Sequence, residues 1–353
     1  MTRKVNILAC GGFGQNMALL LATRPLFESI KESVNLFAFD TSESNLKRFA
    51  GTPIEKQVKK FLVEKADGSG KRRAENHEAI TAVATDFVNT GEAADGLTII
   101  VSSASGGSGS KFADDLHEQL ARRGGRVISM ILGTDEDSEA LGNTLKTIKT
   151  YSHKASLGDK NFVMFYGQNR FDVDVPAGEK PRTIIDEARA DELFVTNLED
   201  IIMIGHPGND TLDTKDQLRF LNYRLDSEGG VGGKGQLRFL SLISRGENED
   251  FPVDEFVPVS ALSLLSKRGV TPQFPEGTGY STRGYLSEGL TFTDNTVEVQ
   301  YQLFSGRTGK LANQLAKQQK VFDDIQAKQA EASSGNEIKR SEKDELTASG
   351  SFL

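Results

Sequence analysis

Apolar and polar positions alternate in blocks along the first half of the chain. Apolar runs of strand length are each followed by a small-residue or polar turn, and then by a stretch with helical spacing. Five such runs predict buried strands at Val5–Ala9, Leu36–Phe39, Leu97–Val101, Arg126–Leu132 and Asn161–Tyr166. Strands that alternate with helices predict a parallel α/β sheet whose ligand lies at the carboxyl ends of the strands.

The second half of the chain has a different pattern. A long helix is expected at Thr183–Met203, and a rise of 1.5 Å per residue gives it a length of roughly 30 Å, enough to cross from one domain to another. The elements expected after it are strands at Gln236–Ile243, Gly289–Thr293 and Val297–Phe304, and helices at Val259–Leu265 and Thr308–Ala330. Residues 333–353 combine Ser, Gly and mixed charge, which predicts disorder. These elements predict a smaller mixed α/β domain followed by a last helix and a tail.

The central stretch of small residues, Ser102–Ser110, lies between the strand at Leu97–Val101 and a helical pattern that starts near Lys111. Small residues let backbone N–H groups crowd around an anion, and the helix N-terminus adds the positive end of its dipole. The hydroxyls of Ser105, Ser108 and Ser110 are expected to supply further donors. We therefore interpret this stretch as a phosphate-binding loop; a flexible surface loop is the alternative.

A second glycine turn follows the first strand, at Gly11–Asn16. A strand–glycine turn–helix unit is typical of phosphate binding, and a Rossmann dinucleotide site is its rival interpretation. Gly12-Phe13-Gly14 supplies the first two glycines of G-x-G-x-x-G, but Met17 occupies the position of the third. Cys10 is expected to be a packed small residue, because no basic partner is identifiable.

Polar residues also follow the other predicted strands. Asp40 ends the second strand. A carboxylate at this place suits binding to the ribose of a dinucleotide or to the magnesium of a nucleoside triphosphate; the alternative is that it caps the helix that starts near Ser42. The stretch Ala66–Arg73 contains Gly68 and Gly70 and three successive cations. It would close over a phosphate or form a solvated basic loop. An acidic loop, Gly133–Glu139, follows a later strand.

Composition limits the classes of function. With 353 residues, 37% hydrophobic and 26% charged, two globular domains of a soluble protein are expected. The net charge of −8 argues against nucleic acid or an acidic membrane surface as the main partner. One cysteine excludes an internal disulfide framework, and four scattered histidines give no metal-ligand spacing. No apolar run is long enough for membrane insertion and no signal-peptide pattern is present, so we expect a cytoplasmic protein.

The chain lacks the Walker A motif of the P-loop proteins, but its loops resemble those of another nucleotide-binding family. Neither Lys111 nor Lys71 satisfies G-x-x-x-x-G-K-[ST], so there is no Walker A motif. Ser105–Ser110 resembles the signature G-G-G-T-G-S-G of the tubulin/FtsZ superfamily, with Ser105 and Lys111 in place of its first and last glycines. Gly11–Asn16 is similar to the first glycine loop of that superfamily. Asp213-Thr214-Lys215-Asp216 matches its D-x-x-D/E loop, and Leu141-Gly142-Asn143 is similar to the phage-encoded branch.

The resemblance implies an architecture: a parallel Rossmann-like GTPase sheet joined by a long core helix to a smaller mixed α/β domain. Its expected segments are a GTP-binding domain at 1–182, the core helix and its loop at 183–222, a smaller domain at 223–306, a C-terminal helix at 307–332 and a disordered tail at 333–353.

The resemblance also implies roles for individual residues, which divide into nucleotide contacts and catalytic groups. The first glycine loop would bind the α- and β-phosphates through Gly11, Gly12, Phe13, Gly14, Gln15 and Asn16. The central loop would bind the β- and γ-phosphates through Ser105, Gly106, Gly107, Ser108, Gly109 and Ser110. Asn169 and Asp186 would read the guanine, with Arg182 four residues earlier in place of the usual stacking aromatic. Asp40 would lie near magnesium, and Gly68, Gly70 and Glu139 complete the nucleotide contacts. No set of protein metal ligands is predicted.

The function implied is a GTPase that polymerises head to tail into cytoskeletal filaments. Asp213 and Asp216 would act on the GTP (hydrolysed to GDP) of the neighbouring subunit, in the presence of Mg²⁺. Lateral filament contacts would run through the C-terminal helix and tail, and no nucleic-acid partner is expected. A phage-encoded filament in the host bacterial cytoplasm would position or transport viral structures. The alternatives are an NAD(P)-dependent Rossmann oxidoreductase and a nucleotide-binding scaffold without hydrolysis.

Overall fold

The structure is a computed structural model. It describes residues 4–64, 66, 68, 76–134, 136–158, 162–173, 176, 178–179, 182–206, 214–221, 223, 237–240, 242–245, 280–286, 290–292, 295–297, 300–306, 323–324 and 327.

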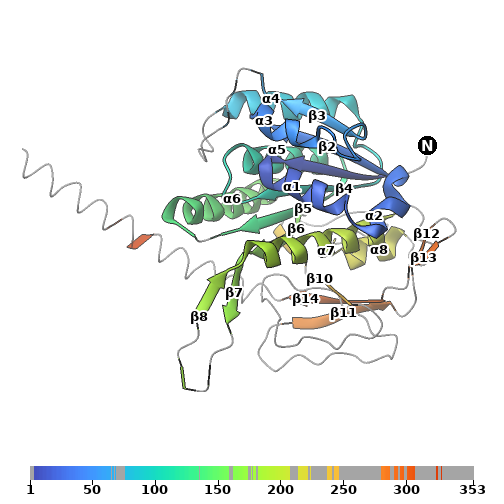
Figure 1. The fold of residues 1–353 in the computed structure, drawn as a ribbon, viewed down its shortest axis with the longest axis vertical. Coiled ribbons are helices and arrows are strands. Elements are labelled where there is room, and N and C mark those ends of the chain that lie inside the picture. The colour runs from blue at the N-terminus through green and yellow to red at the C-terminus, as the bar shows by residue number, and fades with distance from the viewer. Residues whose placement is uncertain are drawn as a thin grey trace, which may run out of the picture.

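A seven-stranded parallel sheet forms the centre of the molecule, with strand order β3-β2-β1-β4-β5-β6-β9 (Figure 1). Its strands are β1 (Val5–Cys10), β2 (Val34–Asp40), β3 (Val58–Leu62), β4 (Leu97–Ser103), β5 (Arg126–Gly133), β6 (Phe162–Gln168) and β9 (Leu237–Leu240). The five strands expected in the first half all form, and the predicted parallel α/β fold class is confirmed. β3 was not predicted, because its lysines at 59 and 60 are exposed and interrupt the apolar run.

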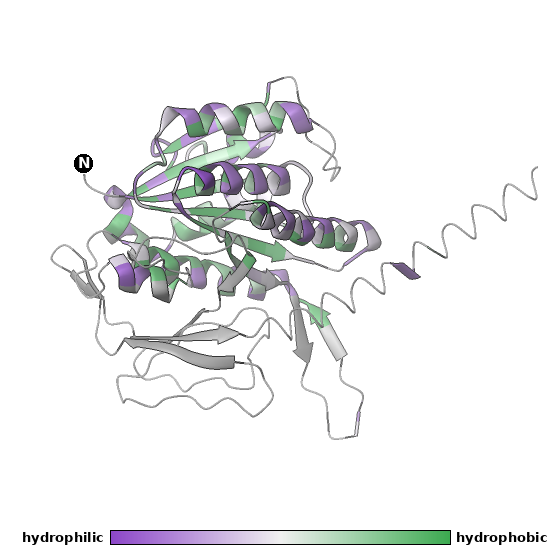
Figure 2. Cartoon of the chain, turned by 180° about the vertical axis from the view of Figure 1, so that it is seen from behind, coloured by the Kyte–Doolittle hydropathy of each residue, from purple (hydrophilic) through white to green (hydrophobic). Residues whose placement is uncertain are grey.

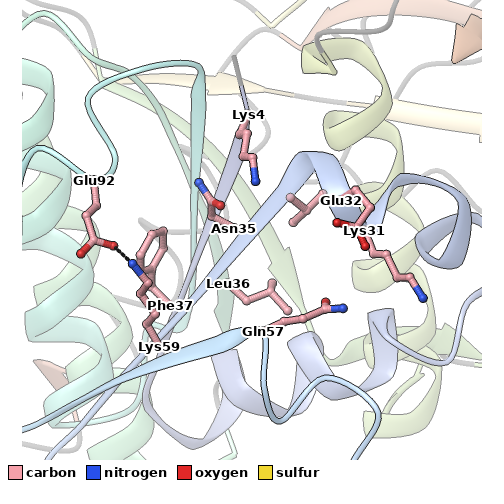
Figure 3. A pocket seen from close by; sticks show the side chains of 10 residues that line it. Lys4, Lys31, Glu32, Asn35, Leu36, Phe37, Gln57, Lys59 and Glu92 are labelled. Carbon is pink, nitrogen blue, oxygen red and sulfur yellow. Dashed lines mark hydrogen bonds and ion pairs between the residues drawn. The ribbon is translucent and has the colours of Figure 1, made fainter. Parts of the chain in front are cut away.

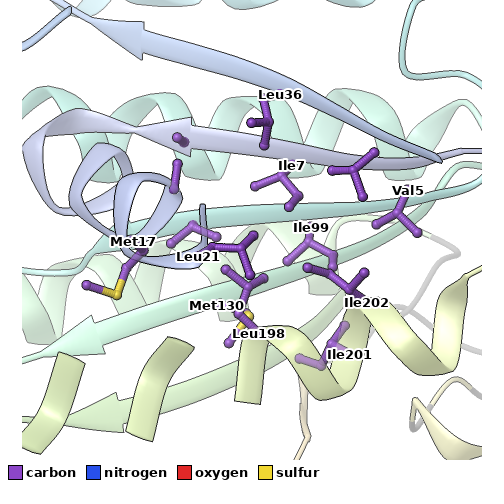
Figure 4. Close-up of a cluster of buried hydrophobic side chains, with 14 of the residues drawn as sticks. Val5, Ile7, Met17, Leu21, Leu36, Ile99, Met130, Leu198, Ile201 and Ile202 are labelled. Carbon is purple, nitrogen blue, oxygen red and sulfur yellow. The ribbon is translucent and has the colours of Figure 1, made fainter. Parts of the chain in front are cut away.

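Helices cover both faces of the sheet, as the alternation of side chains along β1 requires. Val5 and Ile7 point to the face covered by α1 (Gly11–Leu21), with α2, α7 and α8 (Figure 4). Leu8 and Cys10 point to the other face, which packs against α4, α5 and α6. The bounds of the other helices are α2 Pro25–Ile30, α3 Glu43–Leu46, α4 His77–Thr90, α5 Ser108–Arg122, α6 Ser138–Ser156, α7 Glu187–Gly205 and α8 Thr214–Phe220. Figure 2 shows the apolar strands enclosed between helices whose outer surfaces are polar.

The long helix begins later than expected. Residues Arg182–Ile185 form β8, which pairs antiparallel with β7 (Arg170–Val173), and α7 runs from Glu187 to Gly205. The carboxylate of Asp186 accepts a hydrogen bond from the Arg189 backbone N–H at 3.0 Å, so Asp186 acts as the N-cap. The expected helical start at Thr183 is therefore wrong, because the β-branched residues before the cap extend into a strand.

The second half contributes antiparallel strands beside the main sheet. β10 (Leu242–Arg245), β14 (Gln300–Gly306) and β11 (Tyr280–Leu286) form one sheet, and β12 (Leu290–Phe292) pairs with β13 (Asn295–Val297). The strand expected at Gln236–Ile243 is wrong as a single element, since β9 joins the main sheet and β10 the smaller one. The expected helix at Val259–Leu265, most of that at Thr308–Ala330 and the tail at 333–353 lie outside the described residues.

Candidate nucleotide-binding site

The two predicted phosphate loops touch each other through their backbones. α1 starts at Gly11 directly after β1, and Gly11 has a φ of +71°. A Cβ added there would lie 2.9 Å from the Gly109 Cα, and one added at Gly109 would lie 2.7 Å from the Cys10 carbonyl oxygen. At Gly14 an added Cβ would lie 2.4 Å from the Val101 carbonyl oxygen. Glycines at these three positions therefore let both loops meet at the carboxyl ends of β1 and β4.

Helix α6 holds the central loop in place. The Asn143 side-chain amide donates to the Ser105 carbonyl at 3.1 Å, and the Thr147 hydroxyl donates to the Ala104 carbonyl at 2.8 Å. The Ala104 N–H donates to the Leu132 carbonyl at 2.7 Å, which ties the loop to β5. Fixing the carbonyls in this way leaves the loop pre-organised before any ligand binds. The sequence analysis did not predict that Asn143 and Thr147 hold the loop. The signal for this role is a polar residue at a buried position on the side of a helix that faces the sheet.

The serine hydroxyls of the central loop differ in what they bond. Ser110 donates to the Gly106 carbonyl at 2.6 Å and lies 3.1 Å from that of Gly107, so its hydroxyl serves the first turn of α5. Ser105 shares a 2.8 Å hydrogen bond with the Ser103 hydroxyl. The expected use of the Ser110 hydroxyl as a phosphate donor is therefore not supported. Its backbone N–H, in the first turn of α5, remains the candidate.

Lys111 turns away from this loop. Its ammonium group forms an ion pair with Asp115 and lies 3.8 Å from Asp114, and both carboxylates are buried. Lys154 on α6 approaches both aspartates at 2.7 Å. The Lys154 charge and its hydrogen bonds, together with those of Lys111, outweigh desolvation and hold the pKa of Asp115 well below its usual range. The lysine in place of the last signature glycine thus belongs to an ionic cluster between helices.

Asp40 is almost fully buried and accepts four hydrogen bonds. The Thr41 and Ser42 backbone N–H groups donate to one carboxylate oxygen at 2.8 and 3.0 Å. The side-chain amides of Gln15 and Asn45 donate to the other oxygen, also at 2.8 and 3.0 Å. Burial raises the pKa of Asp40, while the hydrogen bonds lower it. A carboxylate accepts about four hydrogen bonds, so this one is saturated and orients Gln15 and Asn45.

Three buried polar atoms around the loops have no hydrogen-bond partner among the described residues. They are Gln15 Oε1, Thr41 Oγ1 and Asn169 Oδ1. Buried polar groups are almost always paired, so unpaired atoms at the carboxyl edge of a parallel sheet indicate a ligand. Together with the glycine contacts between the loops, they fit a nucleotide. Among the described residues no group of three or more His, Cys, Asp or Glu side chains could hold a metal ion.

The two predicted base-reading residues lie next to each other. The Asp186 backbone N–H donates to the Asn169 carbonyl at 2.8 Å, where the β7–β8 hairpin leaves and rejoins the domain. Asn169 is buried, and Asp186 is partly buried at the start of α7. The fold therefore brings together two residues 17 positions apart and leaves the Asn169 carboxamide oxygen available.

The structure gives single contacts or only the burial of some other predicted site residues, and does not describe the rest. The Gly68 N–H donates to the Thr41 carbonyl at 3.1 Å, which brings this glycine near the end of β2. Glu139 is exposed in the first turn of α6. The Phe13 ring packs edge-on against Phe194 of α7 at 5.1 Å, so this side chain serves the core. An added Cβ at Gly12 would meet only the Asn45 side chain, at 3.5 Å. Asn16 is partly buried; Gly70 and Asp213 lie outside the described residues, as does the Asp216 side chain.

Helix α8, which carries Asp216, lies at the opposite edge of the sheet. α7 starts at the carboxyl edge beside Asn169 and ends at Gly205, which packs against Leu97 at the amino end of β4. Just after α8, the Tyr223 hydroxyl donates to the Val127 carbonyl at 2.6 Å, at the amino end of β5. Figure 1 shows α8 on the same side of the molecule as the N-terminus. Within one chain, α8 and the phosphate loops are therefore separated by the length of the sheet.

A pocket of about 430 Å³ also lies at this amino edge (Figure 3). Its lining includes Lys4, Glu32 and Gln57, and a Lys59–Glu92 ion pair on one side. Ligands of parallel sheets bind at the carboxyl edge, so this pocket is distinct from the candidate site.

Comparisons with known proteins agree with this geometry. No family model matches the chain. A phage tubulin-like protein of Pseudomonas phage PhiPA3 is 26% identical over 166 residues, which are 47% of this chain and 48% of that protein. A phage tubulin-like protein of Pseudomonas phage 201phi2-1 is 29% identical over 150 residues, 42% of this chain and 43% of that protein. The matched sequence thus spans about half the length of the curated relatives or less.

Solved structures match over most of the chain. A protofilament of TubZ from bacteriophage PhiKZ has a TM-score of 0.59 at 18% identity and covers 92% of each chain. The structure of the phage tubulin PhuZ with GDP has a TM-score of 0.62 at 18% identity, over 92% of this chain and 93% of that one.

The chain therefore has the α/β fold of the tubulin/FtsZ superfamily. Within that class, the resemblance to the phage-encoded, PhuZ-type branch is confirmed by the curated relatives and by the solved phage structures.

Proposed function

We propose that the chain binds GTP at the carboxyl edge of its sheet and assembles head to tail, with hydrolysis to GDP at the junction between subunits. One observation carries this proposal: α7 spans the sheet from the base-reading pair to α8, so the phosphate loops and Asp216 occupy opposite ends of one chain. A site that needs both ends is complete only between two copies. A heterologous contact of this kind does not close, and it propagates as a filament.

The nucleotide would be held by backbone groups of the two glycine loops. Residues Gly11–Asn16 would bind the α- and β-phosphates, and Ser105–Ser110 at the start of α5 would bind the β- and γ-phosphates. Gly68 and Gly70 would close over them, and Glu139 would complete the contacts from α6. Mg²⁺ would be bound chiefly by the phosphates themselves. The saturated Asp40 would act by holding Gln15 rather than as a metal ligand.

The base would be read by Asn169 and Asp186. An aspartate carboxylate accepts from both guanine N1–H and the exocyclic amine, whereas adenine offers no such pair of donors. The adjacent positions of these residues and the unpaired Asn169 Oδ1 support this role. Arg182, which would stack on the base, is the first residue of β8 and lies four positions before Asp186.

Hydrolysis would use the carboxylates that the neighbouring subunit supplies. Asp213 and Asp216 would orient and polarise the attacking water at the γ-phosphate, which a positioned base does in phosphoryl transfer. In an isolated subunit the site would lack these groups. We therefore propose that assembly activates hydrolysis.

The relatives support assembly and nucleotide binding for this chain. One solved neighbour is a TubZ protofilament, a second contains GDP, and a third is a PhuZ201 filament with a TM-score of 0.58. The role we propose follows theirs: a phage-encoded filament in the host cytoplasm that positions or transports viral structures, with lateral contacts through residues 307–353. No helix in the described part of the chain is both long and apolar enough to cross a bilayer.

The oxidoreductase alternative is not favoured by any specific observation. The strand order β3-β2-β1-β4-β5-β6 is shared with dinucleotide-binding folds and does not discriminate. Met17, at the position of the third fingerprint glycine, is packed into the core with 1% of its surface exposed. Titration of the purified chain with labelled GTP and with NADH separates the two classes.

The experiment that tests the proposal measures GTP turnover per subunit as a function of protein concentration. We expect turnover to rise steeply at the concentration where filaments sediment. An Asp216→Ala variant is expected to bind GTP and form filaments that persist. Turnover per subunit that is constant at every concentration would exclude a site shared between subunits, and binding without any turnover would indicate the scaffold alternative.

A further inference from the structure

The β7–β8 hairpin is a two-stranded ribbon that projects from the domain between the two base-reading residues (Figure 1). Arg170 pairs with Ile185 at its base and Val173 with Arg182 farther out, and the Glu179 N–H donates to the Pro176 carbonyl at 3.0 Å in the connecting turn. The ribbon forms a sheet of its own and pairs with no other described strand. It therefore stands apart from the main sheet.

Two adjacent isoleucines are exposed on this ribbon. Ile184 has 49% and Ile185 37% of its surface exposed, although they are large and β-branched. Successive residues of a strand point to opposite faces, so apolar surface is exposed on both faces of β8 at this end. An isolated two-stranded hairpin is marginally stable in water, and exposed apolar residues on both faces indicate that another surface packs against it.

The position of the ribbon identifies that surface. The ribbon leaves the domain after Asn169 and returns at Asp186, at the same edge as the phosphate loops. Stacking that brings the α8 end of one copy over the phosphates of the next also brings that end toward the ribbon. The occupant consistent with this placement is the next copy of the chain.

We infer that the β7–β8 hairpin is a longitudinal assembly contact, which inserts into the α8-bearing end of the neighbouring subunit so that Ile184 on one face and Ile185 on the other are both covered. This inference rests on the proposed head-to-tail assembly and adds a specific contact to it. The hydrogen bond from Asp186 to Asn169 closes the base of the hairpin. A base bound to both side chains would fix the orientation of the ribbon, so nucleotide binding and this contact would support each other.

The test replaces both isoleucines with threonine, which keeps the branched Cβ that suits a strand and removes apolar surface. Leu193→Thr is the matched control, because Leu193 is a similarly exposed apolar residue, at 42%, on the flank of α7. Three quantities are measured in the full-length chain: the melting temperature, the affinity for GDP and the critical concentration for GTP-dependent sedimentation. A second double variant, Ile184→Lys with Ile185→Lys, adds repulsion to the loss of packing.

We expect the threonine double variant to raise the critical concentration about tenfold, the loss that follows when one side chain of this size is no longer buried. The lysine variant should raise it further, while the melting temperature and the GDP affinity of the unassembled subunit, measured below the critical concentration, stay unchanged and Leu193→Thr assembles normally. An unchanged critical concentration in both double variants would overturn the inference and leave head-to-tail assembly standing. Changed bundling at an unchanged critical concentration would also overturn it, since the contact would then be lateral. An unmutated chain that never sediments with GTP would contradict the proposed function itself, and this inference with it.

Discussion

The contact between the two glycine loops gives the sharpest prediction about this fold. A Cβ on Gly109 would lie 2.7 Å from the Cys10 carbonyl oxygen and 3.0 Å from the Gly11 Cα. The first distance is about 0.7 Å inside the 3.4 Å at which ordinary contact begins, and both neighbours are backbone. Gly109→Ala must therefore push β1 and its loop away from α5. Overpacking of this kind costs about 1–3 kcal/mol of unfolding free energy.

The same loop supplies the matched control. An added Cβ at Gly106 would meet only the Ser103 carbonyl oxygen, at 3.9 Å. Gly106→Ala should therefore change the unfolding free energy by no more than about 0.5 kcal/mol. Gly14→Ala, whose Cβ would lie 2.4 Å from the Val101 oxygen, should cost more than Gly109→Ala.

Urea unfolding of the nucleotide-free chain, followed by far-UV circular dichroism, measures these differences. We expect the unfolding free energy to be highest in the unmutated chain and to decrease in the order Gly106→Ala, Gly109→Ala and Gly14→Ala. GDP affinity should also fall in Gly109→Ala, because the displaced loops are the ones proposed to hold the phosphates. Equal unfolding free energies for Gly109→Ala and Gly106→Ala would refute the reasoning, since the loops would then separate at no cost.

Three further predictions concern the ionic cluster, a buried histidine and the base site. Lys154→Ala removes one of the two ammonium groups that face the buried carboxylates of Asp114 and Asp115, so it should cost about 3–5 kcal/mol in urea unfolding. Arg122→Ala, which removes a more exposed partner from the rim of the same cluster at Glu118, should cost less than about 1 kcal/mol. Similar costs for the two variants would contradict the assigned burial. Burial, with the Lys154 charge, lowers the pKa of His117 to about 3. Between pH 6.5 and about 3, the imidazole therefore takes up a proton in the unfolded chain but not in the folded chain. The free energy of unfolding should fall on acidification by up to about 1.4 kcal/mol per pH unit in this range. His117→Gln should remove that part of the slope between pH 6.5 and 5, and an unchanged slope would show that the ring protonates in the folded state. Asp186→Ser keeps an N-cap for α7 but loses the carboxylate, so GTP affinity should fall about tenfold or more with little change in melting temperature. Asp186→Ala should lower both the GTP affinity and the melting temperature. Equal affinities of the unmutated chain for GTP and ATP would contradict the proposed reading of the base.

The sequence predicts the central strands well because their burial is nearly complete. Residues Leu97–Val101 are buried on both faces, so a continuous apolar run is sufficient to identify β4. The edge strand β3 was not predicted because Lys59 and Lys60 are exposed, and β8 was not predicted because its consecutive isoleucines, Ile184 and Ile185, are both exposed and give no alternation. Local pattern is informative only where the core imposes it.

The glycine loops of the site could be predicted, but the contacts that support them could not. Asn143 and Thr147 bond to residues 38 and 43 positions earlier in the chain, and no local pattern encodes such a distance. Lys111 occupies the position of the last signature glycine in the sequence, and only the structure shows that its side chain binds a carboxylate one turn along α5. Side-chain direction depends on which helices pack together, and only the folded chain determines this.

The central claim is that each catalytic site is built from two subunits, and mixing two defective variants tests it most directly. Asp216→Ala lacks the group supplied by the α8 end, and Asp186→Ser lacks the base contact at the other end. When the two variants are mixed equally at random, about one junction in four of the mixed filament would combine an intact nucleotide site from one subunit with an intact α8 end from the next. We predict that GTP turnover per subunit in the mixture exceeds the average of the two variants measured alone. Turnover equal to that average at every mixing ratio would show that the site lies within one subunit, and would contradict the account.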